Sequence, residues 1–156
     1  MRRIVLAMIV LAALTGCAMT IPTDPQGTLD RVRGGTLRVG VSHHEPQVRW
    51  RGEGHEPRGT EPEFVRRFAS SLDADVSWTG DAGEEALVSA LEDGELDLVI
   101  GGLTDRSPWS AQVALTAVYA RSLGPDGEPI GHVMAIQQGE NAFLVELERF
   151  LRRAAG

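Results

Sequence analysis

The sequence lacks paired cysteines, an excess of basic residues, and an apolar run long enough to cross a membrane. Its single cysteine excludes an internal disulfide and a zinc site built from several cysteines. Of 15 basic residues, two lie in an expected leader, so 13 face 22 acidic residues, a net charge of −9 that argues against a nucleic-acid partner. The longest unbroken apolar run, residues 4–14, is shorter than the roughly 20 residues that a spanning helix needs.

The first seventeen residues are typical of an export signal. Arg2 and Arg3 precede the apolar run, and Leu-Thr-Gly-Cys follows at residues 14–17. These four residues resemble the lipobox of bacterial lipoproteins, which implies cleavage before Cys17 and diacylglycerol on its thiol. We therefore expect an extracytoplasmic protein, lipid-anchored to a bacterial membrane, with a signal peptide over residues 1–16 and a lipidated tether over residues 17–35. The alternative is an ordinary secretory signal followed by a buried cysteine.

After the tether, strand and helix patterns alternate. The composition, with 42% hydrophobic and 24% charged residues, fits one domain with a packed core. Residues 36–41, 76–79 and 96–100 have the apolar and β-branched composition of strands. Two helical patterns separate these three stretches. The order predicts an α/β fold with a central, mostly parallel sheet flanked by helices and joined by right-handed crossovers.

Short polar motifs mark where the two helices begin and end. Thr60 and Glu63 have the spacing of a capping box, which predicts the start of the first helix. Asp81 and Glu84 predict the cap of the second. Gly94 is suited to the left-handed conformation that ends this helix.

The pattern changes in the last third of the chain. Residues 113–119 are extended, residues 123–129 are rich in glycine and proline, and residues 132–136 read as a strand, so we expect a short antiparallel ribbon. A last helix carries an apolar stripe that we expect to be core. Glu148 and Arg152 are spaced to pair on its surface.

Two loops that follow strands form the candidate binding site. In open parallel sheets, ligands bind beyond the carboxyl ends of the strands. One loop covers residues 42–50 and the other residues 101–106. Glycines in the second loop allow close approach of a ligand, Thr104 offers a hydroxyl, and Arg106 offers donors for an anion. The alternative is that the two glycines only make a turn.

Four segments together resemble the extracellular solute-binding proteins that include the polar-amino-acid receptors of ABC transporters. They are Leu-Arg-Val-Gly-Val at 37–41, Gly-Thr-Glu-Pro-Glu-Phe at 59–64, Gly-Glu-Leu-Asp-Leu-Val-Ile-Gly-Gly-Leu-Thr at 94–104 and Val-Ala-Leu-Thr at 113–116. The resemblance implies a type 2 periplasmic-binding fold that captures a small polar solute for a permease, without catalysis or a cofactor. Receptors of this family place a carboxylate-binding arginine five residues after the loop hydroxyl, where this chain has Trp109.

The family has two lobes joined by hinge strands, and between residues 119 and 132 this chain has room only for a turn. We therefore expect a single lobe over residues 36–156, with a linker over residues 121–131 and an antiparallel ribbon in place of the second lobe. Because small-molecule sites normally bury most of the ligand, a monomer of this kind is not expected to hold a solute tightly.

The leading hypothesis is a lipid-anchored, one-lobe relative of the solute-binding proteins in an ABC-type transport system. The candidate ligand-binding residues are Ser42, Trp50, Glu61, Gly102, Thr104, Arg106 and Trp109. The alternative is a scaffold lipoprotein that binds a permease, another membrane partner or a second copy of itself through the exposed face of the lobe.

Two other readings carry less support in the sequence. An enzyme is not expected, because no set of Ser, His and Asp has catalytic spacing. A transition-metal site could be built in one loop rich in imidazoles and carboxylates. Its candidate ligands are His43, His44, Glu45, Glu53, His55 and Glu56. Such a run is more often a solvated loop, and no spacing matches a known ligand framework, so no metal is expected.

Overall fold

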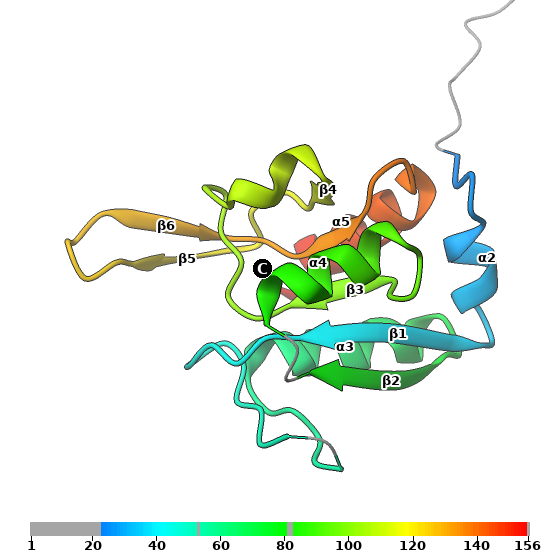
Figure 1. Cartoon of the computed structure of the whole chain (residues 1–156), viewed down its shortest axis with the longest axis horizontal. Coiled ribbons are helices and arrows are strands. Elements are labelled where there is room, and N and C mark those ends of the chain that lie inside the picture. Colours follow the sequence, from blue (N-terminus) through cyan, green and yellow to red (C-terminus); the bar gives the residue numbers. More distant parts are fainter. Residues whose placement is uncertain (1–22, 53, 81–82, 156) are drawn as a thin grey trace, which may run out of the picture.

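The protein is described by a computed structural model over residues 23–52, 54–80 and 83–155. The expected signal peptide and Cys17 lie outside these residues. A five-stranded sheet has the order β2-β1-β3-β7-β4 (Figure 1). Its strands are β1 (Thr36–Val41), β2 (Asp75–Gly80), β3 (Leu98–Ile100), β4 (Val113–Leu115) and β7 (Ala135–Gln137).

The sheet is mixed, with most strands in one direction. β1 pairs in parallel with β2 on one side and β3 on the other. β7 pairs antiparallel with both β3 and β4, so β7 alone runs against the other four. This arrangement confirms the predicted α/β class with a mostly parallel sheet.

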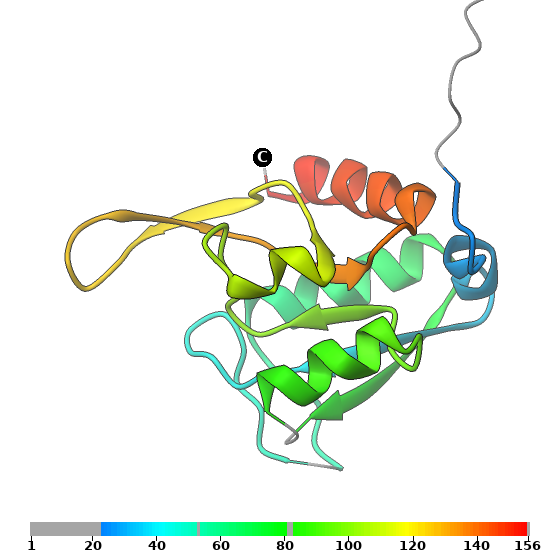
Figure 2. The ribbon, with the colours of Figure 1, turned by 45° about the horizontal axis from the view of Figure 1, so that its top comes forward.

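Helices cover both faces of the sheet (Figure 2). α2 (Thr28–Val32), α3 (Thr60–Ser71) and α5 (Asn141–Ala154) pack on one face, and α4 (Glu84–Glu92) packs on the other. Successive side chains of a strand point to opposite faces, so Leu98 and Ile100 join the α3 and α5 side while Val99 joins the α4 side. A sheet buried on both faces explains why its central strands are almost wholly apolar.

A two-stranded ribbon projects from the body of the protein (Figure 1). It consists of β5 (Ala120–Leu123) and β6 (Pro129–His132), which pair antiparallel as predicted. The expected strand at residues 132–136 is divided between β6 and β7. The chain changes partner there, because Val133 N donates to Leu103 O at 3.0 Å before β7 joins the sheet.

The segment expected to be a tether is partly folded. Residues 23–35 contain α2, whose Leu29 and Val32 are buried in the core. Asp24 caps two helices at once: one carboxylate oxygen accepts from Ala142 N at 2.7 Å and the other accepts from Leu29 N at 2.9 Å. α2 thus packs on the lobe ahead of β1, and it overlaps residues 29–33, where the sequence allows one helical turn.

The helix starts differ from the sequence motifs. α3 begins after Gly59 and has no side-chain cap, so the predicted capping box of Thr60 and Glu63 is not formed. Gly59, with a φ of 125°, is itself the N-cap, which places Thr60 in the first turn of the helix. α4 begins after Gly83, also without a side-chain cap, and Asp81 lies outside the described residues.

Two local predictions about the helix surfaces are met by the structure. Gly94, just beyond α4, has a left-handed φ of 72°. On α5, a guanidinium nitrogen of Arg152 lies 3.8 Å from a carboxylate oxygen of Glu148, as the spacing predicts. In the described part of the chain, no helix has the length and apolar character needed to cross a bilayer.

A buried carboxylate fastens α2 to the sheet. Asp97, immediately before β3, is 2.8 Å from Arg31 on α2 and 2.6 Å from Arg38 on β1. Its other oxygen accepts from Arg38 N at 2.9 Å. Burial alone would raise the pKa of Asp97, but the hydrogen bonds from Arg38 and Arg31 bring it below its usual range. The ionised form of Asp97 thus stabilises the fold.

Candidate functional site

The loops that follow β1 and β3 meet at the carboxyl edge of the sheet, as predicted. Ser42 N donates to Ile100 O at 2.9 Å, which continues the pairing of β1 and β3 into the loops. Gly101 has a φ of 137°, and a Cβ there would collide with the carbonyl oxygen of Ser42. Gly102 has a φ of 75°, and a Cβ there would collide with the ring of His44. Both glycines are thus required by contact between the two loops.

Glu61 fixes the glycine loop from behind. Its carboxylate is fully buried, and one oxygen accepts from Gly101 N at 2.8 Å and Gly102 N at 3.4 Å. The other oxygen accepts from the Tyr119 hydroxyl at 2.6 Å. Burial raises the pKa of Glu61, and the hydrogen bonds from Tyr119 and the glycines offset part of this rise. Burial and the adjacent carboxylate raise the pKa of Tyr119.

A groove of about 310 Å³ opens where the two loops face the β5–β6 ribbon. One wall belongs to the loop after β1, a second to the loop after β3, and the third to the ribbon and its turn. The lining residues are His44, Glu45, Pro46, Gln47, Gly102, Thr104, Ser122, Leu123, Gly124, Pro125, Ile130 and His132. The volume is in the range of small-molecule sites.

Three polar side chains meet inside this groove. His132 Nε2 lies 2.8 Å from Ser122 Oγ and 3.3 Å from Gln47 Nε2. The His132 side chain is enclosed, with 5% of the residue exposed. Its Nδ1 and the Gln47 Oε1 are buried and have no hydrogen-bond partner among the described residues.

Four of the seven candidate residues from the sequence lie in or beside the groove. Gly102 and Thr104 line it. Glu61 lies behind the glycine loop and holds it through hydrogen bonds. Ser42 packs against Gly101 beneath the groove. Of these four residues, only Gly102 and Thr104 reach the groove surface.

The other three candidates point elsewhere. Trp50 is buried and packs on Gly80 at the end of β2, where a Cβ would come within 2.6 Å of the indole nitrogen. Trp109, in the short helix η1 (Pro108–Ala111), donates from Nε1 to Glu84 Oε1 at 2.7 Å. Arg106 is exposed and does not line the groove. These residues stabilise neighbouring elements or face solvent.

Sequence reasoning missed the polar centre of the groove. Gln47 and Ser122 lie in segments treated as a loop and a linker, and His132 lies at the start of an apolar stretch. The position of His132, as the only polar residue at the entrance to that stretch, was the available signal. Its meeting with Gln47 depends on contact between residues 85 positions apart.

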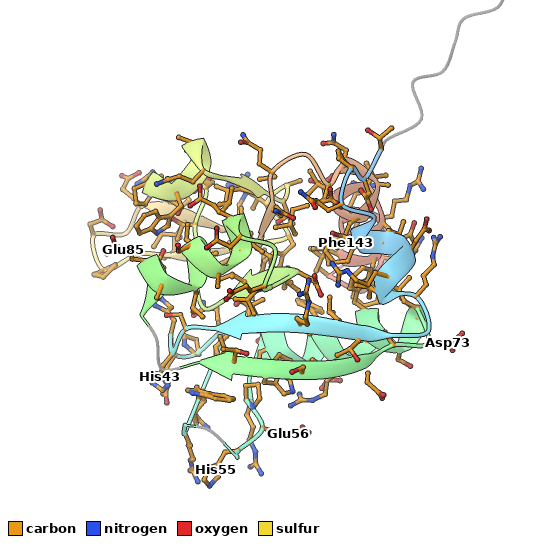
Figure 3. The ribbon with its side chains drawn as sticks, turned by 45° about the vertical axis from the view of Figure 1, so that its right-hand side comes forward. His43, His55, Glu56, Asp73, Glu85 and Phe143 are labelled. Carbon is orange, nitrogen blue, oxygen red and sulfur yellow. The ribbon has the colours of Figure 1, made fainter. Side chains whose placement is uncertain are left out.

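The histidine-rich loop was the candidate metal site in the sequence. Among the residues that the structure describes, no three His, Cys, Asp or Glu side chains are grouped to hold a metal. His43 instead accepts from Trp50 N at 3.1 Å. Figure 3 shows His55 and Glu56 on a loop that projects from the sheet, away from His43. Glu53 lies outside the described residues.

A larger hollow of about 590 Å³ lies between α3 and the edge strand β2. Arg66 crosses it, with its guanidinium carbon 5.5 Å from the ring centre of Trp78. The same guanidinium is 3.0 Å from Glu56. Arg66, Trp78 and Glu56 thus contact one another, and Ser70, Asp73 and Asp75 also line the hollow.

The sequence defines the family of the chain. Residues 37–154 match the family described as bacterial extracellular solute-binding proteins, family 3, and the chain belongs to this family. A similar curated protein is the membrane-bound lytic murein transglycosylase F of Shewanella pealeana, 27% identical over 139 residues, or 89% of this chain. This chain spans only 27% of that protein's length.

Solved structures share the fold. Domain 1 of TmArgBP in its arginine-bound form has a TM-score of 0.67 at 21% identity, over 80% of this chain and 97% of that chain. The ancestral cationic amino acid solute binding protein AncCDT-1 has a TM-score of 0.68 at 14% identity, over 81% and 93%. The unliganded, open L-cystine solute receptor of Neisseria gonorrhoeae has a TM-score of 0.65 at 11% identity, over 81% and 90%. The fold is one lobe of the type 2 class.

Proposed function

We propose that this chain is the lipid-anchored, extracytoplasmic solute-binding protein of an ABC-type transport system, reduced to one lobe. The observation that carries the proposal is the groove at the carboxyl edge of the sheet. Membership of a solute-binding family supports a binding role for it. Gln47, Ser122 and His132 supply the polar contacts, and no step of catalysis is assigned to them.

The ribbon supports the reduction to one lobe. Family resemblance implies that a second lobe would be inserted between the strands that correspond to β5 and β6. Here a short turn joins them, closed by Gly124 N donating to Glu128 O at 2.8 Å. Domain 1 of TmArgBP, solved in an arginine-bound form, supports the view that one lobe is sufficient to hold a solute.

A lipid on Cys17 would keep the lobe close to the membrane. Thr23 O already accepts from Asn141 N at 3.0 Å, so the folded part begins about six residues after Cys17, a reach of roughly 20 Å when extended. The test is metabolic labelling with radioactive fatty acid. Cys17→Ser is expected to abolish labelling of the chain, and unchanged labelling would contradict the anchor.

Solute binding is tested by calorimetry on the full chain, purified from membranes in detergent. The probes are the amino acids, together with sugar acids. Saturable heat from any of them supports the proposal, and absence of heat across the panel contradicts it. The transport assignment is tested by affinity purification of the tagged chain from membranes. Co-purification of a permease supports it, provided that the permease is not recovered with a tagged variant that lacks the lobe.

A second candidate function is a scaffold that binds a second copy of itself, favoured by the free edge of the ribbon. All four residues of β5 are exposed, and Leu123 is 75% exposed. The outer edge of β6 bonds to the glycine loop, because Asp105 N donates to Gly131 O at 2.9 Å, whereas β5 has no second strand partner among the described residues. Unpaired edges of this kind pair readily with other strands.

Crosslinking in native membranes separates the two functions. A dimer band that is lost in Leu123→Asp and retained in Leu29→Ile, a matched change in the core, supports the scaffold. If the chain remains monomeric at all crosslinker concentrations, the scaffold function is contradicted.

A further inference from the structure

Positive charge gathers in the loop after β1, although the chain as a whole is acidic, with 22 acidic and 15 basic residues. Arg49, Arg51 and Arg58 fall within ten residues of sequence. Together with His55 and Glu56 they line a pocket of about 140 Å³. The lining therefore carries three arginines against one glutamate. A local excess of one sign in a chain of the opposite sign favours a ligand that is an anion.

Backbone pairing forces two of these arginines side by side. Arg49 N donates to Arg58 O at 2.6 Å, and Arg58 N donates to Arg49 O at 2.9 Å. Residues that exchange both hydrogen bonds lie directly opposite each other, with their side chains on the same face. Trp50 is buried, and its exposed neighbours Arg49 and Arg51 share the opposite side of the chain. Because like charges placed opposite each other are destabilising, an anion between them relieves the repulsion.

The three guanidinium groups keep most of their donors available. The Nε of Arg49 donates to Glu45 Oε1 at 2.9 Å, which leaves the two terminal nitrogens of this arginine. Within the described part of the chain, neither Arg51 nor Arg58 has an ion-pair partner. Arginines without a carboxylate partner can direct their planar forks of donors to a bound oxyanion.

The single carboxylate of the lining is paired from outside the pocket. Arg66 Nη2, on α3, donates to Glu56 Oε2 at 3.0 Å and to Pro57 O at 2.6 Å. The Arg66 guanidinium also lies over the ring of Trp78. These contacts fasten the returning arm of the loop to α3. They also offset the charge of Glu56, so the arginines determine the sign of the pocket.

From this arrangement we propose that the pocket binds a tetrahedral oxyanion of the phosphate type, as inorganic phosphate or as the phosphate group of a soluble ester. The forked donors of arginine match phosphate oxygens. A phosphate group has oxygens enough for three guanidinium groups, whereas a carboxylate has two. The pocket has roughly the volume of five water molecules in the liquid, which suits one small anion.

The site is separate from the groove and from the expected anchor. The linings of the pocket and of the groove share no residue, so this inference goes beyond the proposed solute-binding function. α2 adjoins the amino end of β1, whereas the loop extends beyond the carboxyl end of the strand (Figure 1). The expected anchor at Cys17 precedes α2 in the chain. We therefore expect the ligand to be a soluble phosphate rather than a lipid headgroup.

The test is calorimetry on the full chain in detergent, at pH 7, in a phosphate-free buffer of low ionic strength, because salt screens exposed charges. The probes are inorganic phosphate, glycerol 3-phosphate, a short-chain phosphatidic acid and acetate. We expect the two soluble phosphates to bind saturably, about tenfold or more tightly than acetate.

Each outcome has a distinct meaning. Absence of saturable heat from inorganic phosphate and glycerol 3-phosphate, or equal binding of acetate, overturns the proposal. Binding of phosphatidic acid alone also overturns it as stated, because the phosphate then belongs to a lipid headgroup. None of these results bears on solute binding in the groove, which is tested with different probes.

Arginine variants test the position of the site. Arg58→Gln is expected to weaken phosphate binding about tenfold or more, which corresponds to the loss of one hydrogen bond to a charged group. Arg51→Gln is expected to act in the same direction. Arg153→Gln, an exposed position near the end of α5, is the matched control that removes the same charge and keeps the affinity.

Circular dichroism confirms that the three variants are folded. If folded Arg58→Gln and Arg51→Gln bind phosphate as tightly as Arg153→Gln does, the anion responds only to the net charge of the chain and the site is overturned.

Discussion

Glu61 is the residue on which the shape of the groove depends most directly, and its removal gives the sharpest structural prediction. The carboxylate accepts hydrogen bonds from Gly101 N, Gly102 N and the Tyr119 hydroxyl. It therefore links α3, the glycine loop and the segment that enters the ribbon. Glu61→Ala removes both oxygens that accept these three hydrogen bonds and leaves a void, whereas Glu61→Gln keeps the shape of the side chain.

The magnitude follows from the donors that are left unpaired. Gly101 N and the Tyr119 hydroxyl make the two short hydrogen bonds, at 2.8 Å and 2.6 Å. A buried donor without an acceptor costs about 1–3 kcal/mol, so Glu61→Ala should lower the free energy of unfolding by about 2–5 kcal/mol. Glu61→Gln should cost about 1 kcal/mol or less, because its oxygen accepts from Gly101 and the Tyr119 hydroxyl can rotate to accept from its nitrogen.

Urea denaturation at pH 5, followed by tryptophan fluorescence, measures these differences. Tyr119→Phe provides the double-mutant control, since its cost should largely disappear in the Glu61→Ala background. A cost below about 0.5 kcal/mol for Glu61→Ala, or equal costs for the alanine and glutamine variants, would refute the role assigned to the carboxylate.

The pH dependence gives an independent check on the same group. Because burial raises the pKa of Glu61 in the folded state, its protonated form is favoured there. The stability it contributes is complete below the ordinary pKa of glutamate, about 4.3, and is lost as pH rises through the folded-state value. The stability of the natural chain should therefore fall relative to Glu61→Gln as pH rises above about 4.3. A constant difference across this range would contradict the argument.

The remaining predictions concern the scaffold around the site. Asp97→Asn should lower the free energy of unfolding by about 2 kcal/mol at pH 7, a value reduced by the partial exposure of both arginine partners. Because the pKa of Asp97 is lowered, this difference should shrink as pH falls below about 3.9, and a difference that persists there would argue against the ion pairs. Gly101→Ala should destabilise more than Gly127→Ala, since both have positive φ but only Gly101 would meet a backbone atom, of Ser42. Equal melting temperatures for the two alanine variants would contradict the close contact assigned to the two loops.

The sheet and its helices were predictable because their signals are local. The apolar stretches at residues 36–41 and 96–100 and the amphipathic face of α5 each reflect burial on a known face, so periodicity identified them. The glycine loop was predictable for a related reason, because residues after a parallel strand lie at the edge where ligands bind.

The parts that were missed depend on contacts between distant segments. A helical turn near residues 29–33 could be predicted, but the contacts that hold α2 could not: Glu140 Oε2 accepts from Thr28 N, and Asp24 Oδ1 accepts from Ala142 N, each across more than a hundred residues. The capping box is not formed because the helix begins one residue earlier than the motif predicts, with Gly59 at the N-cap and Thr60 already in the first turn. The groove itself arises where Gln47 meets His132, and no spacing in the sequence records that meeting.

The central claim is that one lobe holds a small solute at the carboxyl edge of its sheet without an opposing lobe. Nuclear magnetic resonance of the ¹⁵N-labelled full chain, titrated in turn with the amino acids and sugar acids of the calorimetric panel, tests it directly. The account predicts saturable shifts centred on the backbone amides of Gly102, Thr104, Ser122 and His132. Shifts centred instead on the hollow beside Val76 and Trp78, or no saturable shift at all, would contradict it.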